Sequence, residues 1–83
     1  MDRFQEMTVF EAVADELSLA AAARRLSLSP PTVTRAIDAL EQRLGVKLLQ
    51  RSTRGVGLTE AGERFLADCR RILAEVSDAD RSA

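Results

Sequence analysis

The polar side chains whose type and spacing would let them hydrogen-bond an external partner lie in two short stretches. The first opens a predicted helix, where Thr34 and Arg35 follow Ser29 and are expected to face solvent. An arginine can donate two hydrogen bonds to a guanine edge, and a threonine can bond a base or lay its methyl on thymine. The second is a predicted loop that carries Arg54, and an arginine there can enter a narrow, electronegative groove. Both stretches suit the non-covalent reading of a nucleic acid.

Catalytic groups are scarce in this chain. It has no histidine, which removes the commonest general base and the commonest metal ligand. Cys69 is the only cysteine, so neither an internal disulfide nor a thiolate metal cluster can form. The thirteen carboxylates are scattered among basic residues. We therefore expect a protein that is not an enzyme and that uses no metal or cofactor.

The distribution of charge favours an anionic partner. The formal net charge is only -1, but residues 24–54 carry seven basic and two acidic side chains. The flanking segments, 1–23 and 55–83, each hold more acids than bases. A basic segment can form an electrostatic footprint for a charged polymer even in a nearly neutral chain. A solvated surface would give the same pattern, so the motifs must decide.

Length and composition limit the fold class and the location. Eighty-three residues, 46% apolar and 30% charged, are typical of one small globular domain. No apolar run approaches the roughly 20 residues that cross a bilayer, and no charged-then-apolar leader opens the chain. We expect a cytoplasmic protein with no membrane partner.

Two short helices are predicted before the first polar stretch. Asp2 and Gln5 have the spacing of a capping box, and the apolar period that follows predicts a helix that ends near Leu17. Ser18 is a good N-cap, which predicts a second, alanine-rich helix over residues 19–26. The small side chains of this second helix allow another helix to pack closely against it.

A third helix is predicted over residues 30–44. Ser29 is its expected N-cap, prolines occupy its first turn, and Gly45 ends it as a left-handed residue would. Apolar residues recur every three or four positions along one face, which we expect to pack inward. The opposite face of the first two turns is then left to solvent, with Thr34 and Arg35 on it.

A hairpin and a long helix are predicted to complete the chain. Strand-type runs at 48–51 and 56–58 flank a loop at 52–55, and such a hairpin must pack on the helices to be stable. Thr59 is the expected N-cap of the last helix, in which apolar residues recur at intervals of seven, as they do where a helix pairs with a partner helix. The residues predicted to form a homodimer interface are Phe65, Cys69, Ile72 and Val76.

A longer pattern of spaced residues resembles the N-terminal DNA-binding domain of LysR-type transcriptional regulators. It begins at Phe10-x-x-Val13-Ala14 and covers nearly the whole chain. Its main part is Ala22-Ala23-x-x-Leu26-x-x-Ser29-x-Pro31-x-Val33-Thr34-x-x-Ile37-x-x-Leu40-Glu41-x-x-Leu44-Gly45, continued by Leu48-Leu49-x-Arg51, Arg54 and Leu58-Thr59-x-Ala61-Gly62. A single triplet would be a weak signal, whereas this many spacings in register are a specific one.

The resemblance implies a mainly α winged helix-turn-helix fold, with a three-helix core, a two-stranded wing and a long C-terminal dimerisation helix. Residues 1–58 would form the DNA-binding domain and 59–83 the linker helix. In that family the third helix lies in the major groove, the wing contacts the minor groove, and the dimer reads an inverted repeat. We therefore expect sequence-specific binding of double-stranded DNA by a bacterial, nucleoid-associated transcription regulator. The family's effector-binding domain would follow residue 83 and is absent from this chain.

The candidate DNA-contacting residues come from the two helix starts, the third helix and the wing. The N-caps at the second and third helices expose backbone amides to phosphate oxygens. The full set is Ser18, Ser29, Pro30, Pro31, Thr32, Thr34, Arg35, Asp38, Arg51, Ser52, Thr53 and Arg54.

The chain departs from the family pattern at three places, the mildest of which is Leu48-Leu49 where the family usually has Leu-Phe before the wing. Leu17-Ser18-Leu19 stands where the family commonly has Gly-Ser-Phe, so a left-handed residue there would cost about 1 kcal/mol at Leu17. Ser29-Pro30-Pro31 replaces the usual Ser-Gln-Pro. The glutamine that could read an adenine is then missing, and we expect base reading to shift to Thr34, Arg35 and DNA shape.

Several alternatives remain open from the sequence. A winged helix can also bind protein, and molybdate-sensing regulators have a similar N-terminal domain. Arg51 could brace the wing through a carboxylate instead of contacting DNA. For four further basic residues, a phosphate contact and a merely solvated position are equally acceptable: Arg24, Arg25, Arg43 and Lys47.

Overall fold

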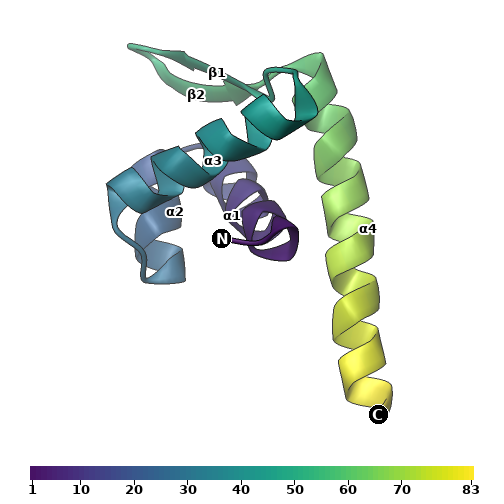
Figure 1. Ribbon diagram of the computed structural model, residues 1–83. Coiled ribbons are helices and arrows are strands. Elements are labelled where there is room, and N and C mark those ends of the chain that lie inside the picture. Colours follow the sequence, from purple (N-terminus) through teal and green to yellow (C-terminus); the bar gives the residue numbers. More distant parts are fainter.

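The computed structural model describes all 83 residues as four helices and one hairpin (Figure 1). The elements in chain order are α1 (Arg3–Glu16), α2 (Leu19–Leu26), α3 (Pro30–Leu44), β1 (Leu49–Ser52), β2 (Gly55–Leu58) and α4 (Glu60–Ser82). Helices α1, α2 and α3 form a compact head, the hairpin extends past one end of it, and α4 runs away as a long rod. This is the expected mainly α winged helix-turn-helix fold. No helix is both long enough and apolar enough to span a membrane.

The predicted helix starts are confirmed by their caps. Asp2 Oδ1 accepts from the Gln5 amide at 2.7 Å, and Gln5 Oε1 accepts from the Asp2 amide at 3.0 Å, which completes a capping box. Ser18, Ser29 and Thr59 each accept from the backbone amide three residues on, at the starts of α2, α3 and α4. The side-chain oxygens satisfy amides that have no partner inside their helices, which fixes where each helix begins.

Leu17 ends α1 in the left-handed conformation, with a φ of 51°. Its side chain is 52% exposed, so little packing compensates for the strain. We expect Leu17→Gly to stabilise the domain by about 1 kcal/mol, because glycine adopts this conformation without a steric cost. Chemical denaturation measures the change. Ala20→Gly, at an exposed position inside α2, should destabilise the domain by a similar amount. A loss of stability in Leu17→Gly would contradict this account of the turn.

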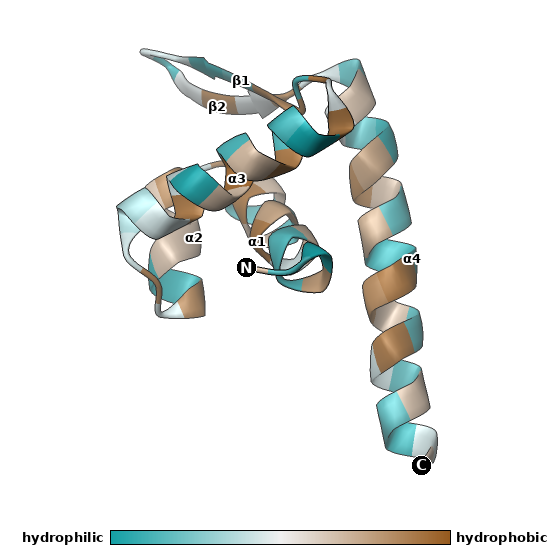
Figure 2. Ribbon diagram, in the orientation of Figure 1, coloured by the Kyte–Doolittle hydropathy of each residue, from teal (hydrophilic) through white to brown (hydrophobic).

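The core lies where α1, α2, α3, β1 and the first half of α4 meet. Its largest fully buried side chains include Phe10, Ile37 and Leu40. Phe65 of α4 packs on Phe10, with ring centroids 5.5 Å apart. Ala22 and Ala23 of α2 are fully covered, as expected where helices approach closely. Beyond Leu73 every residue of α4 is exposed, although apolar residues continue along the helix (Figure 2).

The wing is tighter than the sequence predicted. The two strands pair antiparallel from Leu49 opposite Leu58 to Ser52 opposite Gly55, which leaves a turn of two residues in place of the four-residue loop expected. Gly55 has a φ of 122°, a value that side chains disfavour, and this glycine lets the chain reverse within so few residues. The shorter turn places Thr53 and Arg54 at the very tip of the wing.

Candidate nucleic-acid interface

The helix-turn-helix is built from α2, the three residues Ser27–Ser29, and α3. Val33 and Ile37 are fully buried and hold α3 on the head. The opposite face of α3 carries Arg35 and Asp38, whose side chains are exposed. The expected division of α3 into a packed face and a solvent face is therefore present.

Thr34 and Arg35 are the uncommitted polar residues at the start of α3. The hydroxyls of Ser29 and Thr32 lie 2.7 Å apart and bond each other, while Ser29 Oγ also accepts from the Thr32 amide. Neither Thr34 nor Arg35 forms a side-chain hydrogen bond or ion pair within the chain. Pro30 and Pro31 are exposed beside them in the first turn. The donors of Arg35 are thus available to an external acceptor.

The basic side chains of residues 24–54 separate into paired and unpaired groups. Arg25 Nη1 lies 3.1 Å from Asp15 Oδ2, and Arg43 Nη2 lies 2.8 Å from Glu6 Oε1. For these two residues the structure favours a role within the head over a phosphate contact. The basic residues of this segment that form no ion pair are Arg24, Arg35 and Arg54.

Arg51 is held by acids of α3. Its Nη2 lies 3.1 Å from Asp38 Oδ1 and 3.9 Å from Glu41 Oε1. This is the bracing arrangement that the sequence left open, in which a strand arginine joins the wing to a carboxylate. Two of the candidate DNA-contacting residues, Arg51 and Asp38, are therefore paired with each other.

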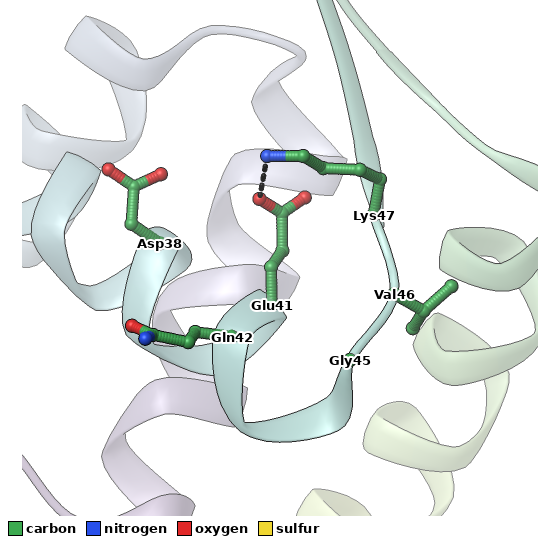
Figure 3. Close-up of a pocket in the computed structure, with 6 residues that line it drawn as sticks. All are labelled: Asp38, Glu41, Gln42, Gly45, Val46 and Lys47. Atoms are coloured by element: carbon green, nitrogen blue, oxygen red, sulfur yellow. Dashed lines mark ion pairs between the residues drawn. The ribbon is translucent and has the colours of Figure 1, made fainter.

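Glu41 fastens the wing to α3, a role that the sequence analysis missed. Its side chain is 6% exposed, and Oε2 accepts from the amides of Leu48 and Leu49 at 2.8 and 3.1 Å. Oε1 faces Lys47 Nζ at 3.6 Å, in a hollow at the end of α3 (Figure 3). The available signal was an acid directly after Leu40, on the inward side of a helix, because a buried carboxylate needs hydrogen-bond donors.

Thr59 and Gly62 join α4 to the start of the wing. Thr59 Oγ1 donates to the Lys47 carbonyl at 2.7 Å and accepts from the Gly62 amide at 2.9 Å, while the Thr59 amide donates to the Leu48 carbonyl at 3.0 Å. A Cβ at Gly62 would overlap the Leu48 carbonyl oxygen, so only glycine allows this approach. Thr59 and Gly62 of the Leu58-Thr59-x-Ala61-Gly62 pattern therefore both serve the contact between α4 and the start of the wing.

The wing tip presents Ser52, Thr53 and Arg54 to solvent. Ser52 Oγ accepts from the Arg54 amide at 3.2 Å, which orders the turn. The guanidinium of Arg54 has no partner in the chain. The tip and the outer face of α3 thus each offer one unpaired arginine, on two different elements.

Two of the four residues predicted for the interface on α4 pack against the head of the same chain. Cys69 is fully buried within the single chain, and Phe65 packs on Phe10 of α1. Burial raises the pKa of the Cys69 thiol to about 11, so the thiol is protonated at neutral pH. Ile72 and Val76 remain 37% and 38% exposed. A seven-residue repeat predicts that an apolar stripe runs along α4, but it does not predict at which residue α1 stops covering that stripe.

Comparison with known proteins decides the family. The family model described as bacterial regulatory helix-turn-helix protein, lysR family, matches residues 4–63. The chain belongs to the LysR family. The match favours this family over the molybdate-sensing regulators that the sequence left open. It includes α1, α2, α3, the wing and the first turn of α4.

Relatives of this LysR-family chain are named as transcriptional regulators. The HTH-type transcriptional regulator TfdS of Cupriavidus pinatubonensis is 57% identical over 70 residues, which cover 84% of this chain and 24% of TfdS. The HTH-type transcriptional activator AaeR of Escherichia coli is 47% identical over 78 residues, 94% of this chain and 25% of AaeR. The chain therefore spans about a quarter of the length of these relatives.

A solved structure of a LysR-family DNA-binding domain superposes on nearly the whole chain. The DNA-binding domain of CbnR, in a crystal structure with DNA, has a TM-score of 0.89 and 51% identity, and the match covers 99% of this chain and 94% of that one. The winged helix-turn-helix architecture and the long α4 are thus shared with a domain whose structure contains DNA.

Proposed function

We propose that this chain binds double-stranded DNA sequence-specifically and is the operator-reading domain of a bacterial LysR-family transcription regulator. Helix α3 enters the major groove and the wing enters the flanking minor groove. The observation that carries the proposal is the position of the unpaired cations. Arg35 on α3 and Arg54 at the wing tip have no ion pair, although acids pair most other basic residues of the chain.

The roles of the side chains follow from their surroundings. Thr34 and Arg35 read base edges, since their polar groups are uncommitted. Ser18 and Ser29 place the first amides of α2 and α3 toward phosphates, while Thr32 and the two prolines shape the first turn of α3. Ser52, Thr53 and Arg54 approach the minor groove. Arg24, at the end of α2, adds a phosphate contact.

The proposed assembly is a homodimer through the exposed part of α4. Ile72 and Val76 lie one helical turn apart on α4, and both are exposed large apolar residues. A two-fold axis between two such helices would present two α3 helices to one face of a duplex, which matches an inverted repeat. Residues 1–58 would then be the DNA-binding domain and residues 59–83 the linker helix. In the whole protein an effector-binding domain would follow. Such a protein would act in the bacterial cytoplasm, on the nucleoid.

Replacing both Ile72 and Val76 with glutamate should give a monomer. Two buried carboxylates facing two others across the axis would lack partners and would repel each other. Sedimentation should then report a mass near 9.1 kDa in place of twice that value. Ala74→Glu, at another exposed position of α4, is the control and should leave the dimer intact. A dimer that survives the double replacement would place the interface elsewhere.

The salt dependence of duplex binding tests the proposed function. Neutralising phosphates releases counterions, so the affinity should fall linearly with salt on logarithmic axes. Anisotropy titrations of labelled duplexes over a range of salt concentrations measure the slope. A chain that binds no duplex at low salt would instead be a winged helix that binds protein.

A further inference from the structure

The wing carries two arginines, of which one is ion-paired within the chain and the other is not. Arg54 at the tip has no ion pair, whereas Arg51 on β1 lies 3.1 Å from Asp38 Oδ1 and 3.9 Å from Glu41 Oε1. The side chain of Arg51 is still 35% exposed, so its guanidinium lies at the surface between the wing and α3. One basic group of the proposed DNA-facing side is thus neutralised inside the chain.

Asp38 lies on the solvent face of α3, on the side used by the reading residues. Positions 34, 35 and 38 share one face, because an α-helix turns once every 3.6 residues. The Asp38 side chain is 56% exposed, while Glu41, the other acid of residues 24–54, is 6% exposed and holds wing amides. Figure 3 shows the two carboxylates on the same side of α3. Asp38 is therefore the exposed negative charge of this basic segment.

The pair between Asp38 and Arg51 is not needed to attach the wing. Glu41 already accepts two wing amides, and Thr59 bonds the Lys47 carbonyl. Ion pairs between exposed side chains contribute little to folding stability. Asp38 is therefore an acid on the solvent face of α3 that the attachment of the wing does not require.

We infer that Asp38 is a specificity-determining residue that acts by restraining Arg51. The inference rests on the proposed function. The Asp38 carboxylate competes with phosphates for the Arg51 guanidinium, and it also repels the DNA backbone. Both effects weaken binding most on a duplex of random sequence, where phosphate contacts carry nearly all the affinity, and less on an operator, where base contacts fix the position of α3. Specificity is a difference between two affinities, and lowering the non-specific one increases it.

Asp38→Asn tests the restraint, because it removes the charge with little change of shape. The affinity for a duplex of random sequence should rise on the order of tenfold at low salt, and the salt slope should steepen by about one unit per protomer as Arg51 gains a phosphate. The preference for the best operator over the random duplex should fall. Asp78→Asn is the matched control, since Asp78 pairs with Arg81 near the far end of α4. It should leave both affinities unchanged.

The same replacement in an Arg51→Gln background separates the restraint from simple repulsion. The gain in random-duplex affinity should be much smaller there, because no guanidinium is left to release. An equal gain in both backgrounds would overturn the inference, as would an unchanged affinity for the random duplex. Weaker binding of the operator alone would also overturn it, because Asp38 would then be reading a base. If the unaltered chain binds no duplex, the proposed function itself fails.

Discussion

Replacing Gly62 with alanine should cost the domain about 3 kcal/mol of stability or more, because the added methyl meets backbone and not a flexible side chain. The new Cβ would overlap the carbonyl oxygen of Leu48 and lie 3.0 Å from its carbonyl carbon. Alanine is the better helix former by about 1 kcal/mol, which is too little to offset this overlap. The start of α4 would have to move away from Leu48, which would break the bonds of Thr59 to the Lys47 and Leu48 carbonyls. Thermal and urea unfolding measure the loss.

Gly57→Ala is the matched control for this prediction. A Cβ at Gly57 meets nothing within 4 Å, and the residue lies in β2 of the same wing. Its replacement should change the unfolding free energy by less than about 1 kcal/mol. If the Gly62 variant is as stable as the Gly57 variant, the close approach of α4 to Leu48 is not required by the fold.

Replacing Arg35 with alanine should weaken binding to the best operator by about 1–3 kcal/mol and relax the preference at one base pair in each half-site. Arg35 has no competing partner in the chain, so all its donors are available to a base edge. Competition titrations with duplexes that differ at single positions measure both effects. Arg3→Ala removes an equally unpaired charge from α1 and should leave the base preference unchanged. An equal loss on every duplex would mean that Arg35 contacts phosphate.

Arg54→Ala should lower the affinity for duplexes according to the sequence that flanks each half-site, and it should leave the base preference at the centre of the half-site unchanged. Minor-groove reading is nearly degenerate beyond A·T against G·C, and an arginine there responds to groove width. The loss should therefore be largest for duplexes with A·T-rich flanks, with the central preference intact. If Arg54→Ala changes no affinity at low salt, the wing has only a structural role.

The sequence predicts what is decided locally, and the structure corrects what depends on distant contacts. The caps at Asp2, Ser18 and Ser29 are set by bonds that span three residues, so their spacing is visible in the chain. The buried bonds of Glu41 join α3 to wing amides, and although the sequence places Glu41 on the inward side of α3, it does not show which donors the carboxylate meets. The same holds for Cys69, because only the packing of α1 on α4 decides which turns of an apolar stripe are covered.

The candidate site was predictable to a similar extent. Helical periodicity places Thr34 and Arg35 on the solvent face of α3 without any tertiary information. Whether an arginine there is available depends on which acids reach it, and this separates Arg35 from Arg51. The tight turn at Gly55 also differs from the predicted loop, because strand pairing extends to the residues on either side of the tip.

Selection of bound duplexes from a random library is the most direct test of DNA reading by paired α3 helices. The selected pool should contain an inverted repeat whose half-sites lie about ten base pairs, or a multiple of that, apart. Arg35→Ala should yield a pool with one base pair less defined in each half-site. A pool without any shared sequence, or the same pool from both proteins, would contradict the account.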